Sequence, residues 1–247
     1  MLEILIYSLA SVLIISLISL IGIITLPIKT QKLEKFLMYL IAFSAGTLLG
    51  DAFIHLLPES IKNGFSLQIS FFILVGIGFS FGIEKIIRWR HCHHLTTKQH
   101  PHHLSSMNLI GDSFHNFIDG MIIGASYLVS IPIGIATSIA IIFHEIPQEI
   151  GDFGILVYAG FSKRKALATN FLISLTSIAG LIISLLISFK TKYLIYILIP
   201  FAVGNFIYIA TADLIPELHK ETKIIKSLIQ LLLFILGIGL MALLLLI

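Results

Sequence analysis

The sequence predicts an all-α integral membrane protein with eight transmembrane helices. Hydrophobic residues make up 57% of the 247 residues, charged residues make up 12%, and the mean hydropathy is +1.02. A soluble globule of this composition would expose far too much apolar surface. Runs of about 20 apolar residues, long enough to cross a bilayer as a helix, recur along the chain. Helices are expected rather than open strands, because a strand edge in lipid leaves backbone groups unpaired.

Only short polar segments separate the predicted spans, so we expect residues 1–247 to form one membrane domain. In chain order the spans are Ile4 to Leu26, Leu33 to Leu57, Phe65 to Ile87, Met107 to Val129, Ile133 to Tyr158, Ala166 to Phe189, Tyr193 to Ile215 and Ile225 to Leu246.

The basic residues predict the orientation of these spans. Alternate connections hold 13 of the 16 Lys and Arg residues, and the opposite face holds only Lys62, Lys190 and Lys192. The basic connections contain Lys29, Lys32, Lys35, Lys85, Arg88, Arg90, Lys98, Lys163, Arg164, Lys165, Lys220, Lys223 and Lys226. Because basic loops remain in the cytoplasm, we expect both termini to be extracytoplasmic. The formal net charge of +3 then reflects topology, and no nucleic-acid partner is expected.

The first span is expected to remain in the protein. Glu3 precedes it and no basic segment does, so the pattern of a cleaved signal peptide is missing. Cys92 is the only cysteine, which excludes an internal disulfide.

Polar side chains lie on one face of the fourth span. His115 and Asp119 are four residues apart, and Asn116 and Asp119 are three apart, so all three point the same way from a helix. An ionised group in hydrocarbon costs at least about 2.5 kcal/mol, so such a face needs a polar partner or a cation.

The fifth span carries a matching set. His144 and Gln148 are four residues apart, and an overlapping stripe contains Glu145, Gln148, Glu149 and Asp152. A tight turn around 130–132 joins the two spans, so their polar faces are expected to meet near the bilayer midplane. Imidazole, carboxylate and amide groups suit Zn²⁺, Fe²⁺ or Mn²⁺ better than Cu⁺. The alternative is a set of hydrogen bonds that only holds the helices together.

Pro147 lies within the polar segment of the fifth span. A proline inside a helix cannot donate to the carbonyl four residues earlier, here that of Phe143. We expect this oxygen to bind water, a side chain or a cation.

A short sequence repeat links the second and seventh spans. His55-Leu56-Leu57-Pro58-Glu59 is echoed by Asp213-Leu214-Ile215-Pro216-Glu217, and by the charge pattern the two spans run in opposite directions. Spans one to three and six to eight are therefore predicted to be inverted repeats around spans four and five. The alternative is a chance similarity between two Pro-Glu helix ends. On the first reading, Asp51, His55 and Glu59 attract a cation outside, and Asn205, Asp213 and Glu217 receive it inside.

The connection 88–106 is rich in histidine and is predicted to be a cytoplasmic loop. It contains six of the ten His residues, namely His91, His93, His94, His100, His102 and His103. Neutral imidazoles hold divalent metals, so the loop is interpreted as a buffer or sensor, with a solvated linker as the alternative.

These motifs together resemble the ZIP (Zrt-, Irt-like protein) family of divalent-metal transporters. The resemblance rests on His115-Asn116-Phe117-Ile118-Asp119-Gly120, on His144-Glu145-Ile146-Pro147-Gln148-Glu149-Ile150-Gly151-Asp152 and on the two Pro-Glu segments. It implies a 3+2+3 helix arrangement, metal movement into the cytoplasm and two adjacent metal positions between spans four and five. By position, it implies a main site of His115, Asp119, His144 and Gln148, and a neighbouring site of Asn116, Glu145 and Gln148.

Gln148 departs from the family pattern, in which many members have a second His. A neutral amide is a weaker ligand and a poor bridge between two cations, so the number of metals and the choice among Zn²⁺, Fe²⁺, Mn²⁺ and Cd²⁺ stay open. Glu149 or Asp119 is a candidate for compensation, although Glu149 lies about 100 degrees further round the helix.

Two other classes of function share these residues. His144-Glu145-x-x-Gln148 resembles a His-Glu-x-x-His metalloprotease motif, but the second His is missing and Pro147 interrupts the motif. A membrane metal sensor without transport would need the same ligands. We therefore expect a transporter and no enzyme, with Zn²⁺ as substrate rather than cofactor, a lipid bilayer around it and a location in the plasma (inner) membrane. Whether the protein is a homodimer stays open.

Overall fold

The structure is a computed structural model that describes residues 2–25, 30–92, 101–190 and 193–246. The described part of the chain is helical and contains no strand. Its main helices are α1 (Leu2–Ile18), α3 (Thr30–Gly50), α5 (Leu67–Cys92), α6 (Pro101–Val129), α7 (Ile131–Tyr158), α8 (Lys163–Ser174), α9 (Thr176–Lys190), α10 (Tyr193–Tyr208) and α12 (Ile224–Leu243). Short helices α2 (Gly22–Thr25), α4 (Leu57–Ile61) and α11 (Ile215–Leu218) complete the spans.

The helices confirm the predicted membrane fold. Within the described residues, seven spans are long and apolar enough to cross a bilayer. The remaining long helix, α6, has 29 residues, and its polar residues Asp112, His115, Asn116 and Asp119 lower its hydropathy. Both α5 and α6 extend beyond the predicted spans, to Cys92 and from Pro101, so part of the predicted loop 88–106 is helical. The side chains of its six histidines lie outside the described residues.

The second and seventh spans contain the same local irregularity. A π-helical segment occupies Asp51–Leu56 in one and Ile209–Leu214 in the other, and a proline follows two residues later in each. The backbone N–H groups just before Pro58 and Pro216 reach back five residues, to Ala52 and Ala210. Proline has no N–H to donate, and single π turns commonly relieve such a break. The sequence repeat therefore has a counterpart in local structure.

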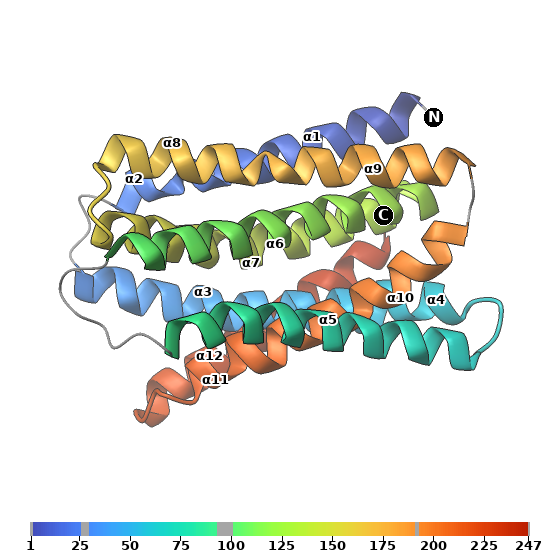
Figure 1. Cartoon of the computed structure of the whole chain (residues 1–247). Helices are drawn as coiled ribbons and strands as arrows, with labels where there is room; N and C mark the ends of the chain where they lie inside the picture. The colour runs from blue at the N-terminus through green and yellow to red at the C-terminus, as the bar shows by residue number, and fades with distance from the viewer. Residues whose placement is uncertain (1, 26–29, 93–100, 191–192, 247) are drawn as a thin grey trace.

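The long helices form two groups (Figure 1). In one group α1, α7, α6 and α9 pack together, with α8 continuing into α9. In the other, α3 packs against α12 and α5 packs against α10. The contacts between the groups run mainly from α3 to α7 and from α10 to α6, which places the polar faces of α6 and α7 at this boundary.

Glycines allow the closest approaches inside the second group. A Cβ on Gly46 of α3 would overlap the carbonyl oxygen of Phe234, and a Cβ on Gly204 of α10 would overlap that of Ile73. Gly46 and Gly204 each lie nine residues before the repeat residues His55 and Asp213. The two helix pairs therefore correspond to each other as an inverted repeat would require. The 3+2+3 arrangement itself stays a prediction.

Candidate metal site

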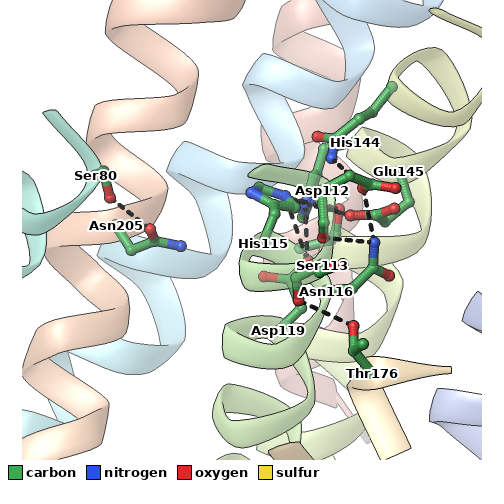
Figure 2. Close-up of polar contacts among 12 residues, drawn as sticks. Ser80, Asp112, Ser113, His115, Asn116, Asp119, His144, Glu145, Thr176 and Asn205 are labelled. Atoms are coloured by element: carbon green, nitrogen blue, oxygen red, sulfur yellow. Dashed lines mark hydrogen bonds and ion pairs between the residues drawn. The ribbon is translucent and has the colours of Figure 1, made fainter. Parts of the chain in front are cut away.

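Four predicted ligands meet between α6 and α7 (Figure 2). They are His115 and Asp119 of α6 and His144 and Glu145 of α7. His144 Nε2 lies 3.1 Å from Asp119 Oδ2 and 3.2 Å from His115 Nε2. Glu145 Oε1 lies 3.3 Å from His115 Nε2 and 3.5 Å from His144 Nε2. We call these four residues the central cluster.

The spacing of the central cluster fits a tetrahedral ion. Zn²⁺ binds nitrogen and oxygen at about 2.0–2.2 Å, so the ligand atoms of a tetrahedral site lie about 3.4 Å apart. The measured separations run from 3.1 Å to the 3.7 Å between His115 Nε2 and Asp119 Oδ2. Two imidazoles and two carboxylates are also a ligand set that zinc accepts.

The central cluster opens on one side only. The side chains of Asp119 and His144 are each 1% exposed and that of Glu145 is 0% exposed, whereas that of His115 is 22% exposed. His115 and His144 line a cavity of about 760 Å³ between the two helix groups. A cation in the cavity would therefore meet His115 first.

Asn116 and Gln148 lie next to the central cluster but point to another residue. The Asn116 amide donates to Asp112 Oδ1 at 2.8 Å, and the Gln148 amide donates to the same oxygen at 3.2 Å. In this arrangement the amide nitrogen of Gln148 donates to a carboxylate, which an amide can do whether or not its oxygen binds a metal.

Glu149 turns away from the central cluster. It is completely buried, and the side-chain amide of Asn170 in α8 donates to its Oε2 and, at 3.3 Å, to its backbone oxygen. A carboxylate oxygen of Glu149 also lies within 4.8 Å of oxygens of Asp112 and Asp152. Asp112, Glu149 and Asp152 thus form a second group, which we call the acidic cluster.

The residues predicted at the path entrance are packed against other helices. Asp51 is 0% exposed and His55 is 6% exposed, with His55 Nε2 2.9 Å from the backbone oxygen of Met241 in α12. Glu59 in α4 pairs with Lys62 at 3.4 Å. The described lining of the cavity includes none of the three entrance residues.

The residues predicted at the path exit all line the cavity. Asn205, Asp213 and Glu217 face it, together with Asp112 and Asp152. Asn205 accepts a hydrogen bond of 2.6 Å from Ser80 of α5 (Figure 2). The cavity therefore joins the central cluster to the predicted exit and not to the predicted entrance.

Two of the neighbouring residues were not predicted. Asp112 precedes His115 by three residues and Asn116 by four, so the same helical spacing that identified the fourth-span face also includes it. Asn170 gives no comparable signal, because a single Asn in an apolar span has no periodic partner.

A family model described as ZIP zinc transporter matches residues 2–107 and 90–245. These segments cover nearly the whole chain, including both polar spans. The chain belongs to the ZIP family. Family members are transporters and not enzymes, so the protease reading of His144-Glu145 fails.

Curated relatives agree with the assignment of this ZIP protein. Zinc transporter zipt-7.1 of Caenorhabditis briggsae is 31% identical over 83% of the chain and 70% of its own length. Zinc transporter zipt-7.2 of Caenorhabditis elegans is 29% identical over 96% of the chain and 64% of its own length. Zinc transporter ZIP13 of Pongo abelii is 34% identical over 84% of the chain and 66% of its own length. The chain thus spans about two thirds of the length of these relatives.

Proposed function

We propose that the protein carries Zn²⁺ across its membrane into the cytoplasm through the central cluster. The observation that carries the proposal is the near-tetrahedral spacing of the four residues of the central cluster, two of which, His115 and His144, line a cavity. The zinc transporters among its relatives support the choice of ion.

The proposed path runs from the outer face, past Asp51, His55 and Glu59, to the central cluster. It continues through the cavity past Asn205, Asp213 and Glu217. The cavity extends from the central cluster to the proposed exit residues, which supports release of the ion on that side. An inside-negative potential favours inward movement of a dication by about 4.6 kcal/mol per 100 mV across the full field.

The orientation and host membrane belong to the same proposal. Among the described residues, Lys220 and Lys223 follow the cavity-lining residues Asp213 and Glu217 directly in the chain, which supports cytoplasmic release and extracytoplasmic termini. The location proposed is the plasma (inner) membrane. The six histidines of 88–106 are proposed to bind the released metal.

Zinc flux into proteoliposomes with a trapped zinc dye tests the proposal. We expect saturable uptake by the native chain and loss of uptake in His144→Ala and Asp119→Ala. His219→Ala is the matched control, because His219 is exposed at the end of α11 and far in sequence from the central cluster. A folded native protein that binds Zn²⁺ without flux would refute transport and support the metal sensor.

A further inference from the structure

The acidic cluster lies about one to two helical turns from the central cluster, toward the start of α6 and the end of α7. Asp112 is nearer than His115 to the start of α6. Glu149 and Asp152 are nearer than His144 to the end of α7. A rise of 1.5 Å per residue puts the two clusters about 5–10 Å apart along the helices. Asp112 and Asp152 line the same cavity as His115.

Burial of the acidic cluster calls for a compensating charge. Asp112 is 5% exposed, Glu149 is 0% exposed and Asp152 is 8% exposed, with one oxygen of each within 4.8 Å of the others. Among the described residues, Asp112 and Glu149 form no ion pair with Lys or Arg. The buried carboxylates of Asp112 and Glu149 repel each other strongly in a low-dielectric site, so protons or a cation close to these two groups would relieve the repulsion.

Neighbouring amides leave oxygens available for a cation. Asn116 and Gln148 both donate to Asp112 Oδ1, and Asp112 Oδ2 has no hydrogen-bond partner among the described residues. Asn170 binds Glu149 Oε2, and Glu149 Oε1 likewise has no such partner. The Asn116 amide lies against Asp112, is completely buried, and its Oδ1 is also without a partner in the described part of the chain.

From these contacts we propose that Asp112, Glu149 and Asp152 form a second divalent-cation site, which receives the ion from the central cluster on its way to the cytoplasm. The inference rests on the proposed function for the ion's direction of travel.

The two sites differ in chemistry. The central cluster offers two imidazoles, whereas the acidic cluster offers oxygen atoms only. Zinc binds nitrogen ligands well, while carboxylates alone suit harder cations such as Mn²⁺. Zinc is therefore held more weakly at the acidic cluster, which favours its release, and Mn²⁺ is the better probe of that cluster.

Electron paramagnetic resonance of Mn²⁺ added to the full-length, zinc-loaded protein in detergent tests the second site. We expect bound Mn²⁺ without ¹⁴N couplings, because no imidazole belongs to the acidic cluster. Asp112→Asn and Glu149→Gln should each weaken this binding at least tenfold. Glu84→Gln, which removes a carboxylate from the same cavity but outside the acidic cluster, should leave it unchanged.

Absence of bound Mn²⁺ in the native protein would overturn the inference and leave the three carboxylates holding protons. The inference would also be overturned if all of the bound Mn²⁺ showed ¹⁴N couplings. It would be overturned as well if neither substitution weakened the binding of Mn²⁺. These Mn²⁺ results can be told apart from a failure of the proposed function. If the proposed function is wrong, His144→Ala retains normal Zn²⁺ flux. In flux assays, Asp112→Asn should lower the maximal Zn²⁺ rate several-fold, since release is slowed, and Glu84→Gln should not.

Discussion

The hydroxyl of Ser44 in α3 donates a hydrogen bond of 2.6 Å to the backbone oxygen of Phe143 in α7. Phe143 is the residue whose carbonyl Pro147 leaves without its helical donor. The predicted gap in α7 is thus filled by a side chain of the opposite helix group. The same hydroxyl lies 2.8 Å from the Leu40 carbonyl of its own helix, so the shorter contact crosses the boundary between the groups.

Ser44→Ala should destabilise the protein by about 1–3 kcal/mol, because it leaves a partly buried carbonyl unpaired. The apparent Tm in detergent measures the change. In a Pro147→Ala background the restored N–H of residue 147 supplies the missing donor, so Ser44→Ala should cost clearly less there. Equal costs in both backgrounds would show that the carbonyl is not what Ser44 stabilises.

Two glycines of α5 offer a matched pair of substitutions. A Cβ on Gly76 would overlap the carbonyl oxygen of Phe201, whereas a Cβ on Gly78 meets nothing within 4 Å. Gly76→Ala should therefore lose about 1–3 kcal/mol through overpacking of α5 against α10. Gly78→Ala should gain up to about 1 kcal/mol from helix propensity. Thermal unfolding of the two variants in parallel tests this, and similar shifts would refute the close helix approach.

A softer ligand in the central cluster should change its preference among metals. Asp119→Cys replaces a carboxylate 3.1 Å from His144 by a thiolate, which favours Cd²⁺ over Mn²⁺. Competition assays of Zn²⁺ uptake should show stronger inhibition by Cd²⁺ and weaker inhibition by Mn²⁺ than in the native chain. Asp119→Asn is the control, since it removes the charge without adding sulfur. An unchanged metal preference would place Asp119 outside the coordination sphere.

Gln148→His should tighten Zn²⁺ binding and slow maximal flux. The Gln148 amide lies 3.2 Å from Asp112 Oδ1, and an imidazole there offers a nitrogen ligand between the two clusters. Isothermal titration and flux assays measure the two effects. Gln148→Leu removes the hydrogen bond without adding a ligand and should not tighten binding. A native-like Kd in Gln148→His would mean that residue 148 does not reach the ion.

Cys92 gives a direct test of orientation, because it is the only cysteine of the chain. A membrane-impermeant maleimide should label it in inside-out vesicles and not in right-side-out vesicles. The opposite pattern is expected for Cys92→Ser combined with Ser66→Cys, since Ser66 is exposed in the connection between α4 and α5. Reversed labelling of the two proteins would invert the predicted topology.

The membrane spans were predictable because apolar length is a local property of the sequence. The approach of His115 and Asp119 to His144 was predictable too, since His115 and Asp119 share a helical face and one turn joins α6 to α7. Glu145 completes the group at the place that the sequence had assigned to Gln148. The partner of Gln148 was not, because the direction of a side-chain amide depends on which carboxylate the tertiary structure brings near it. The contact between Glu149 and Asn170 also depends on the tertiary structure, because Asn170 lies in another helix. The angle around the helix had indicated only that Glu149 faces away from His144 and Gln148.

The partial exposure of His115 sets an order for ligand exchange. On the proposed path, a departing ion would lose its bonds to the more deeply buried Asp119 and Glu145 before its bond to His115. His115 is then the last residue of the cluster to hold the ion, and incoming water replaces protein ligands one at a time. In this order the ion would not be stripped of every ligand at once, and stepwise rehydration would keep the barrier to dissociation low.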